Sequence, residues 1–221
     1  SSQKQFDVSM MTSEELNSRI GSILQACSRM MPTHFHDFMD RLAKDGRVQR
    51  HYTQNIDCIE TRTACLEHRT VWLHGRADMV ICRQCNYTID ICSAQFEGIV
   101  GSHCTRCKET SAKRTAKGKR ALSIGCLWPK VLLYGESSSP DDTAISTIYN
   151  KDRAEHVDAV VIAGTRLKTS GARDLARNFC RMVKARGGII IWVCRESPKL
   201  GKEFNALLNE ILVGDCDEFA C

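Results

Sequence analysis

Four cysteines form the clearest chemical pattern in this chain of 221 residues. They stand in two Cys-x-x-Cys pairs, Cys82 with Cys85 and Cys104 with Cys107, and 18 residues separate the pairs. Each pair can wrap one side of a tetrahedral zinc ion, and four thiolates leave no open position for water. The spacing therefore predicts a structural zinc site. His103 stands next to Cys104 but is not needed as a ligand, because the four cysteines already complete the coordination shell of the zinc ion.

A polar run follows the β-prone segment 48–53. Gln54, Asn55 and Asp57 stand where a strand is expected to end, and polar side chains at the carboxyl end of a sheet strand can reach a ligand in the crevice. Amides offer donors and acceptors, and a carboxylate accepts hydrogen bonds from ribose hydroxyls. Without further context, a polar cap on a strand explains the same residues.

Two shorter patterns could also support chemistry. His74 lies between Leu73 and Gly75, and an imidazole is a natural general base near neutral pH, although a lone histidine is more often structural. Gly164 and Thr165 close an apolar run, which fits either a backbone turn that approaches a nucleotide or an ordinary tight turn.

These residues need elements to position them. A capping box at Thr12 predicts a helix over 12–31, and a second helix is expected to begin after Thr33 and to end at Gly46. From residue 130 onward the pattern alternates between apolar strands and amphipathic helices, which indicates βαβ units of a parallel sheet. The expected strands are 131–134, 157–163 and 189–193, and the expected helices are 172–186 and 203–212.

The composition along the chain predicts an α/β protein with a Rossmann-like parallel sheet, helices on both faces and a small inserted zinc-binding module. Residues 1–69 would form the N-terminal helices and the first part of the Rossmann-like domain. Residues 70–126 would form the zinc-binding module and a basic loop over 108–126, and residues 127–221 the remainder of the larger domain.

The net charge of +5 is concentrated in one segment. A solvated loop explains such a run, but a patch that meets nucleic acid or chromatin, or a nuclear-import signal, fits it as well. The basic residues between 108 and 120 are Lys108, Lys113, Arg114, Lys117, Lys119 and Arg120. We expect no membrane contact and no signal peptide, because the sequence lacks a long apolar run and an apolar h-region at its start.

Taken in order, these motifs resemble those of the sirtuins, the NAD-dependent lysine deacylases. The resemblance runs from about residue 30 to residue 218. Within the family, the chain is most similar to fungal nuclear histone deacetylases. It rests on the cysteine quartet and on the segments Y-T-Q-N-I-D at 52–57, L-H-G at 73–75, V-L-L-Y-G-E at 131–136, V-I-A-G-T at 161–165 and G-D-C-D at 214–217.

The resemblance implies a reaction and its participants. The acetyl oxygen of a substrate lysine would attack the ribose carbon of NAD and expel nicotinamide, and the products would be free lysine and O-acyl-ADP-ribose. The expected partner is an acetylated lysine protein, in the first place a histone, within a nuclear chromatin complex, with nucleic acid contact through residues 108–120. Zinc and NAD are the implied cofactors.

The resemblance also implies roles for individual residues. His74 would be the general base on a ribose hydroxyl. The implied NAD-binding residues are Gln54, Asn55, Asp57, Gly164, Thr165, Arg166 and Cys216. The implied binding residues for the acyl-lysine peptide are Leu132, Tyr134, Gly135 and Glu136.

Three departures from the sirtuin pattern support an alternative. The glycine motif G-A-G-x-S and the first strand of the sheet are absent, so the Rossmann-like sheet is expected to be incomplete at the N-terminus. Arg166 replaces a serine, and Cys194-Arg195 replaces a usual asparagine. The alternative is a catalytically inactive, zinc-bearing scaffold subunit of a chromatin complex. A nucleic-acid-binding zinc protein is a third reading, which the lack of interleaved aromatic residues disfavours.

Overall fold

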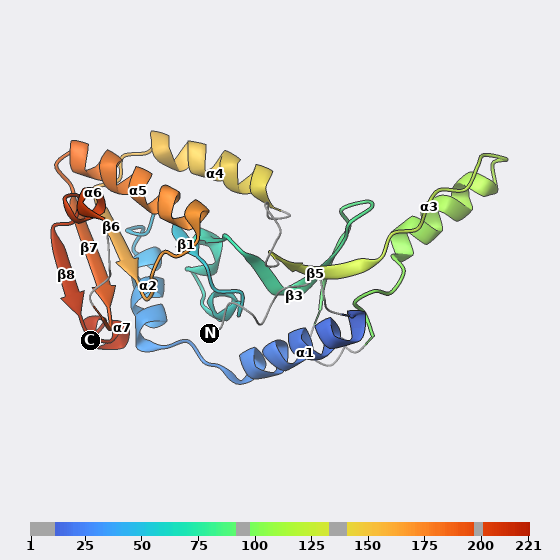
Figure 1. Cartoon of the computed structure of the whole chain (residues 1–221), viewed down its shortest axis with the longest axis horizontal. Coiled ribbons are helices and arrows are strands. Elements are labelled where there is room, and N and C mark those ends of the chain that lie inside the picture. The colour runs from blue at the N-terminus through green and yellow to red at the C-terminus, as the bar shows by residue number, and fades with distance from the viewer. Residues whose placement is uncertain (1–11, 92–97, 133–140, 197–200) are drawn as a thin grey trace. The chain divides into compact units, whose positions relative to one another are not determined.

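The structure is a computed structural model that describes residues 12–91, 98–132, 141–196 and 201–221 (Figure 1). It divides into two compact units. The first, here the cysteine unit, is drawn from Ser1–Met31, Asn55–Ile59 and His74–Asp142. The second, here the parallel-sheet unit, is drawn from Pro32–Gln54, Glu60–Leu73 and Thr143–Cys221.

The cysteine unit contains two long helices, of which α1 contacts β3. α1 spans Ser13–Arg29 and α3 spans Thr105–Thr115. The predicted capping box at the start of α1 is confirmed, because the Thr12 hydroxyl accepts from the Glu15 amide at 3.2 Å and the Glu15 carboxylate accepts from the Thr12 amide at 2.8 Å. These bonds satisfy backbone donors that the first helical turn leaves open.

A three-stranded antiparallel sheet forms the centre of the cysteine unit, in the order β4-β3-β5. The strands are β3 (Gly75–Cys82), β4 (Thr88–Asp90) and β5 (Leu127–Val131). Its buried core consists of short apolar side chains together with three of the four motif cysteines. The core residues are Ala77, Val80, Cys82, Ile91, Val100, Cys104, Cys107, Leu127 and Val131.

The parallel-sheet unit contains the predicted βαβ arrangement. Strands β6 (Ala159–Ala163), β7 (Ile189–Cys194) and β8 (Glu210–Val213) pair in parallel in that order. Helix α5 (Ser170–Ala185) connects β6 to β7 and packs against both strands, as Figure 1 shows. Ile190 and Trp192 of β7 are completely buried, so the middle strand forms the centre of this core.

A second, two-stranded parallel sheet in the same unit joins β1 (His51–Thr53) to β2 (Thr70–Trp72). Helix α2 (His34–Lys44) precedes it and ends before Gly46, as predicted. The other helical elements of the chain are the 3-10 helices η3 (Ile59–Arg62) and η4 (Glu67–Arg69) and the α-helices α4 (Asp142–Ala154), α6 (Lys202–Asn205) and α7 (Cys216–Phe219). The predicted α/β fold with parallel strands and helices is therefore confirmed.

The predicted helix over 203–212 is wrong. Only α6 is helical there, and β8 follows it. Asn209 marks the change, because its backbone amide donates to the Ile190 carbonyl at 2.9 Å and its side-chain oxygen accepts from the Ile190 amide at 3.0 Å. Pairing with β7 thus overrides the local preference for a helix, a tertiary effect that the local sequence does not reveal.

The predicted loop over 108–126 is also wrong in its first part, because α3 runs to Thr115. Cys104 stands at the N-cap of this helix, and Cys107 and Ser111 are its buried residues. Attachment to the cysteine cluster thus stabilises a helix whose other residues are almost all polar. Helix α4 had no counterpart among the predicted elements.

Candidate functional site

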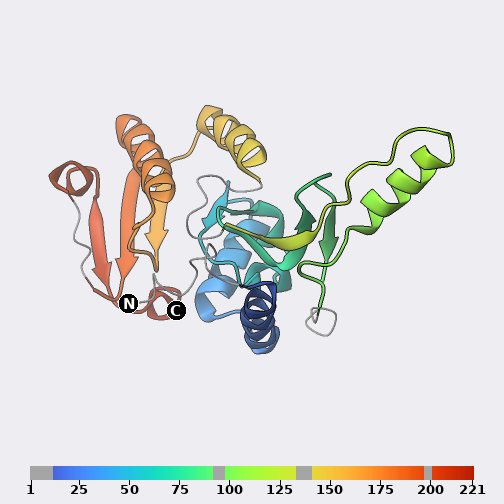
Figure 2. The same cartoon turned by 45° about the vertical axis from the view of Figure 1, so that its right-hand side comes forward.

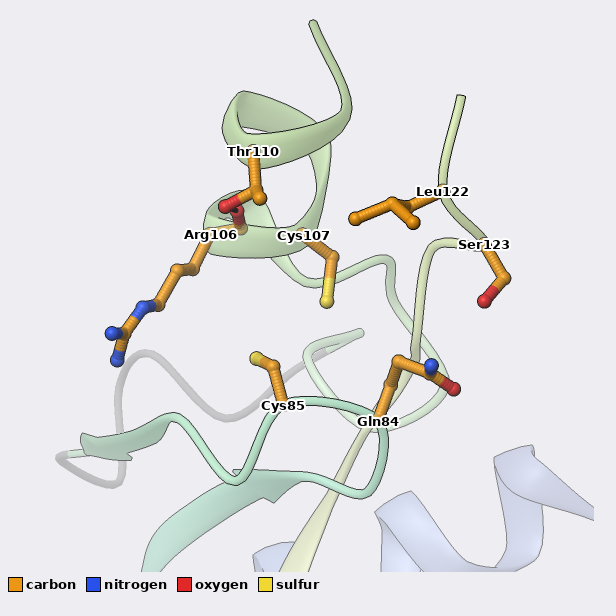
Figure 3. Close-up of a pocket in the computed structure, with 7 residues that line it drawn as sticks. All are labelled: Gln84, Cys85, Arg106, Cys107, Thr110, Leu122 and Ser123. Atoms are coloured by element: carbon orange, nitrogen blue, oxygen red, sulfur yellow. Dashed lines mark hydrogen bonds between the residues drawn. The ribbon is translucent and has the colours of Figure 1, made fainter. Parts of the chain in front are cut away.

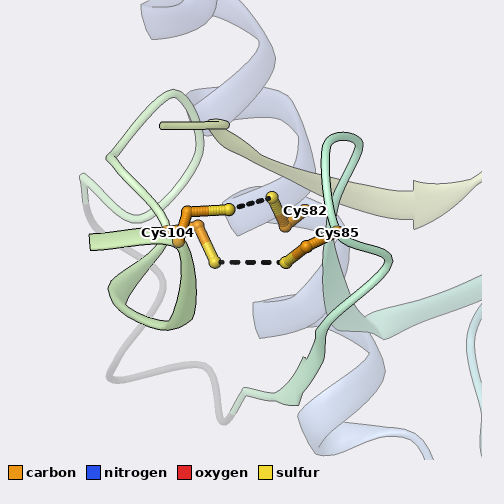
Figure 4. A group of neighbouring side chains, drawn as sticks. Cys82, Cys85 and Cys104 are labelled. Atoms are coloured by element: carbon orange, nitrogen blue, oxygen red, sulfur yellow. Dashed lines mark hydrogen bonds between the residues drawn. The ribbon is translucent and has the colours of Figure 1, made fainter. Parts of the chain in front are cut away.

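The four predicted metal ligands lie together in the cysteine unit. The sulfur atoms of Cys82, Cys85, Cys104 and Cys107 all lie within 4.8 Å of one another. Cys82 and Cys107 are 3.7 Å apart, and Cys85 and Cys104 are 3.8 Å apart (Figure 4). A tetrahedron with zinc–sulfur bonds of about 2.3 Å has sulfur–sulfur edges of about 3.8 Å. The cluster therefore fits a zinc ion.

Local backbone geometry brings the two cysteine pairs together. The Cys82 carbonyl accepts from the Asn86 amide at 2.8 Å, and Asn86 adopts a positive φ of 55°, so the chain turns tightly after β3. The Cys104 amide donates to the Gly125 carbonyl at 2.8 Å. A Cβ on Gly125 would lie 2.6 Å from the Cys82 sulfur, so only glycine permits this approach.

The backbone also prepares one cysteine for ionisation. Burial opposes formation of the Cys82 thiolate, but hydrogen bonds from the backbone amides of Cys85 and Gln84 outweigh it and lower the pKa of Cys82 to about 7. Zinc binds the thiolate form, so this arrangement favours metal binding at neutral pH.

A cavity of about 280 Å³ lies beside the cysteine cluster (Figure 3). The Cys85 and Cys107 side chains form part of its wall, and the others come from the turn after β3, from α3 and from the segment that follows α3. The lining residues are Gln84, Cys85, Arg106, Cys107, Thr110, Leu122 and Ser123. This mixed polar and apolar cavity leaves one side of the cluster open to solvent.

The predicted general base stands at the junction of two strands. The Leu132 amide donates to the His74 carbonyl at 2.8 Å, directly after the pairing of Gly75 with Val131. Gly75 has a φ of 80°, and a Cβ there would lie 2.1 Å from the Lys130 carbonyl oxygen. The glycine of L-H-G is thus required for His74 and the predicted peptide-binding residue Leu132 to be neighbours.

The turn that carries Asn55 and Asp57 is tied to strand β3 within the cysteine unit. The Ala77 amide donates to the Ile56 carbonyl at 3.0 Å, and the Asp57 carboxylate accepts from the Ile59 amide at 3.3 Å. Cys58 has a positive φ of 59°. Burial raises its pKa to about 12, which keeps this thiol protonated and structural.

The other predicted NAD-binding residues belong to the parallel-sheet unit. Gln54, after β1, donates from its side-chain amide to the Thr165 hydroxyl at 2.7 Å. Gly164, after β6, has a φ of 63°, and a Cβ there would lie 3.8 Å from the Cys216 sulfur. This unit therefore brings Gln54, Gly164, Thr165 and Cys216 together at the carboxyl ends of parallel strands, where open α/β sheets bind their ligands.

Of the residues that depart from the sirtuin pattern, Arg166 lies at the surface and Cys194 in the core. Arg166 points its guanidinium to Glu196 at 3.2 Å, and its side chain is 72% exposed. Cys194 is buried at the end of β7, and Arg195 forms an ion pair with Asp215 at 2.6 Å. Tyr134, Gly135 and Glu136, predicted to bind the peptide, lie outside the described residues.

A buried ionic network was missed by the sequence analysis. The Arg50 guanidinium donates to both Asp152 carboxylate oxygens, at 2.8 and 3.0 Å, and the Tyr52 hydroxyl donates to the same carboxylate at 2.6 Å. The Asp152 side chain is 1% exposed. Asp152 lies in α4, whereas Arg50 directly precedes β1 and Tyr52 lies within it, so no local spacing could have revealed the network.

Comparisons with known proteins agree with this arrangement. The model of the Sir2 family matches residues 2–170. The chain is 32% identical to the NAD-dependent protein deacetylase hst4 of Emericella nidulans over 97% of its length and 38% of that protein. It is 30% identical to the NAD-dependent histone deacetylase HST4 of Saccharomyces cerevisiae over 91% of the chain and 59% of that protein.

Solved structures show the same fold. A Sir2 homologue in complex with NAD superposes with a TM-score of 0.67 at 21% identity, over 94% of this chain and 68% of the other. A mutant Sir2 homologue in complex with ADP ribose gives a TM-score of 0.71 at 22% identity, over 94% and 71%. The match of the family model to most of the chain, together with the relatives' identity, shows that this chain belongs to the Sir2 family.

Proposed function

We propose that the protein is an NAD-dependent protein lysine deacetylase that acts on histones. The contact between the Leu132 amide and the His74 carbonyl carries this proposal, because it places the predicted general base beside the predicted start of the peptide-binding strand. The relatives' names, NAD-dependent protein or histone deacetylase, support it. The chain spans 38% and 59% of the length of those relatives, so the activity of the whole protein is part of the proposal.

The side chains divide the work of binding. Gln54, Asn55 and Asp57 provide amide and carboxylate groups that can pair with ribose and nicotinamide. Gly164, Thr165 and Cys216 line the position where the adenosine part would lie, and Arg166, exposed beside Glu196, could meet phosphate. A residue larger than glycine at 164 would project toward Cys216 and narrow this space.

NAD, when bound, supplies a glycosidic bond to nicotinamide that can be exchanged for a bond to the acyl oxygen of the substrate. His74 then removes a proton from a ribose hydroxyl, which lets that oxygen accept the acyl group. The peptide is held beside it by backbone pairing with the chain from Leu132 onward through Tyr134, Gly135 and Glu136, a β-augmentation mode of binding.

The zinc ion has a structural role in this proposal. Cys82, Cys85, Cys104 and Cys107 hold it, and its four-thiolate shell leaves no position for a substrate. We also propose that residues 70–126 act as a module inserted between the segments 1–69 and 127–221 that build the larger domain.

The proposed setting is the nucleus, where the protein would act on histones within a chromatin complex. The histone deacetylase names of the fungal relatives support this setting. The basic run over 108–120 supports contact with nucleic acid. No described helix is long and apolar enough to cross a membrane.

The test is nicotinamide release from NAD by the purified protein, with and without an acetyl-lysine histone peptide. We expect steady-state release that depends on the peptide and falls at least 100-fold in His74→Ala, because turnover stops when the general base for the later acyl transfer is removed. His68→Ala, an exposed histidine, serves as the matched control and should keep full activity.

The alternative function is an inactive, zinc-bearing scaffold of a chromatin complex. It is favoured by Cys194, Arg195 and Arg166, which stand where sirtuins place other residues. Absence of release from a folded, zinc-loaded protein would support the scaffold and reject the enzyme. Release that is equal in His74→Ala and wild type would reject the role of His74.

A further inference from the structure

Helix α3 and the segment that returns from it form a projection of the cysteine unit, here the basic finger, residues 105–125. Figures 1 and 2 show α3 extending beyond β5, with the return segment running back beside it. Ser111 holds the two arms together, because its hydroxyl accepts from the Leu122 amide at 3.1 Å and donates to the Leu122 carbonyl at 3.2 Å. The finger is therefore a defined structure.

The finger carries an unbalanced positive charge. Its only acidic residue is Glu109. Its basic residues are Arg106, Lys108, Lys113, Arg114, Lys117, Lys119 and Arg120. All of these are exposed except Arg114, which is half-buried, and none forms an ion pair with any residue that the structure describes. The Arg106 guanidinium lies over the Tyr87 ring, 5.4 Å from its centroid, and this contact neutralises no charge. The positive charges are thus available to a partner.

The helical spacing aligns part of this charge. Arg106, Thr110 and Lys113 follow one another at intervals of four and three residues, which places them along one face of α3, and Lys117 follows in the turn after the helix. Arg106 and Lys113 are separated by about 10 Å at helical rise. Duplex DNA carries a negative charge for every ~1.7 Å of its axis, so such a row meets several phosphates at once.

The residue types of the finger favour duplex nucleic acid over a single strand or a protein as its partner. Residues 105–125 contain no aromatic side chain, whereas proteins that hold single strands stack bases on aromatic rings. The apolar residues of α3 are Cys107, which is buried, and the small Ala112, so the helix offers no anchor for the apolar core of a protein interface. The exposed Leu122 and Ile124 stand on the return arm only.

We propose that the basic finger binds the phosphate backbone of duplex DNA without regard to sequence, through Arg106 and Lys113 on α3, Lys117 in the turn that follows, and Lys119 or Arg120 on the return arm. This inference deepens the nucleic acid contact of the proposed function and does not depend on deacetylase activity. The finger would hold the protein on chromatin while the site at His74 acts on a histone.

The test is fluorescence anisotropy of a labelled 20-base-pair duplex, titrated with the zinc-loaded protein over a range of KCl concentrations. Four phosphate contacts predict a slope of log K against log salt of about −3.6, and two contacts about −1.8. The charge reversal Lys113→Glu with Lys117→Glu should weaken binding at least tenfold and reduce the slope by about half. Lys113→Arg with Lys117→Arg should bind as wild type does.

The matched control is Lys151→Glu with Lys184→Glu. These lysines are also exposed and also lie on helices, in α4 and α5, and the exchange changes the net charge of the chain by the same amount. Duplex binding that weakens in the finger variant and not in this control supports the proposal. Equal weakening in both, tighter binding to a single strand, or binding to an acidic peptide but not to the duplex would overturn it.

Discussion

Asp152 is the residue whose burial has the clearest energetic consequence. Its carboxylate is 1% exposed and is neutralised by the Arg50 guanidinium, while the Tyr52 hydroxyl donates to it as well. Burial of the Tyr52 ring and the contact with Asp152 raise the pKa of the phenol, so it remains a donor. The network fixes β1, which ends at Thr53 directly before Gln54, a residue of the candidate NAD site.

We predict that Asp152→Ala lowers the free energy of unfolding by about 3 kcal/mol, because it leaves a guanidinium without its buried partner. Urea denaturation followed by circular dichroism measures this change. Asp152→Asn should lose less, since it keeps a polar partner for Tyr52, and the exposed Asp158→Asn serves as the control. A loss of less than about 0.5 kcal/mol, typical of surface substitutions, would contradict the prediction.

The lowered pKa of His51 predicts how the free energy of unfolding depends on pH. Burial, with a contribution from His36, lowers the pKa of His51 to about 4 from its ordinary 6.5. The unfolded chain therefore binds more protons between these values, so stability is full above pH 6.5 and falls as pH decreases toward 4. The shift corresponds to a loss of roughly 3 kcal/mol in the free energy of unfolding. The Glu60 carboxylate, 3.9 Å from the ring, reduces this loss because it stabilises the protonated form of His51.

His51→Gln removes this titration and should flatten the stability profile between pH 6.5 and 4. The measurement is the difference in unfolding free energy between variant and wild type at each pH. His156→Gln, at an exposed histidine, should reproduce the wild-type profile. Identical profiles for His51→Gln and wild type would show that His51 is not responsible.

At the scale of elements, the junction of β3 and β5 depends on a single glycine. Gly75 combines a φ of 80° with a Cβ position 2.1 Å from the Lys130 carbonyl oxygen, whereas Gly118 combines a φ of 69° with open space around it. Alanine at Gly118 would therefore cause backbone strain alone, whereas alanine at Gly75 would cause both backbone strain and a steric clash.

We predict that Gly118→Ala costs about 1 kcal/mol, the usual penalty of a left-handed alanine. Gly75→Ala should cost at least about 2 kcal/mol more, because a backbone atom must move and the pairing of His74 with Leu132 must shift. Thermal unfolding of both variants measures the difference. Equal losses would show that the strand junction tolerates a side chain.

The cysteine cluster joins β3, the tight turn after it and α3. Metal binding should therefore determine whether these three elements fold. We predict that a chelator, or Cys107→Ser, removes zinc and abolishes the cooperative unfolding transition of the cysteine unit. Zinc content by mass spectrometry and circular dichroism report the two effects. Cys126→Ser, outside the cluster, should leave both unchanged, and a chelated protein that keeps its transition would contradict the structural role.

The elements differ in how far the sequence alone predicted them. α1 and α2 begin at capping boxes, and α1, α2 and α5 each carry an apolar face, so their positions were predicted closely. β8 and α3 were not, because pairing with β7 and attachment to the cysteine cluster decide their structures. Motif spacing predicted the zinc ligands, but the Arg50–Asp152 contact joins residues far apart in the chain and left no local signal.

At the scale of the molecule, the residues with predicted roles divide between the two compact units. The cysteine unit carries His74, Asn55, Asp57 and Leu132. The parallel-sheet unit carries Gln54, Gly164, Thr165, Arg166 and Cys216. The proposed function assigns these residues, unit by unit, roles in the transfer of an acyl group from lysine to the ADP-ribose part of NAD.

The most direct measurement is mass spectrometry of all products after the purified protein has acted on an acetyl-lysine histone peptide and NAD. We expect equal amounts of nicotinamide, deacetylated peptide and O-acetyl-ADP-ribose, and neither deacetylated peptide nor O-acetyl-ADP-ribose in His74→Ala. Deacetylated peptide with free acetate and unconsumed NAD, or no product from a folded, zinc-loaded protein, would contradict the proposed function.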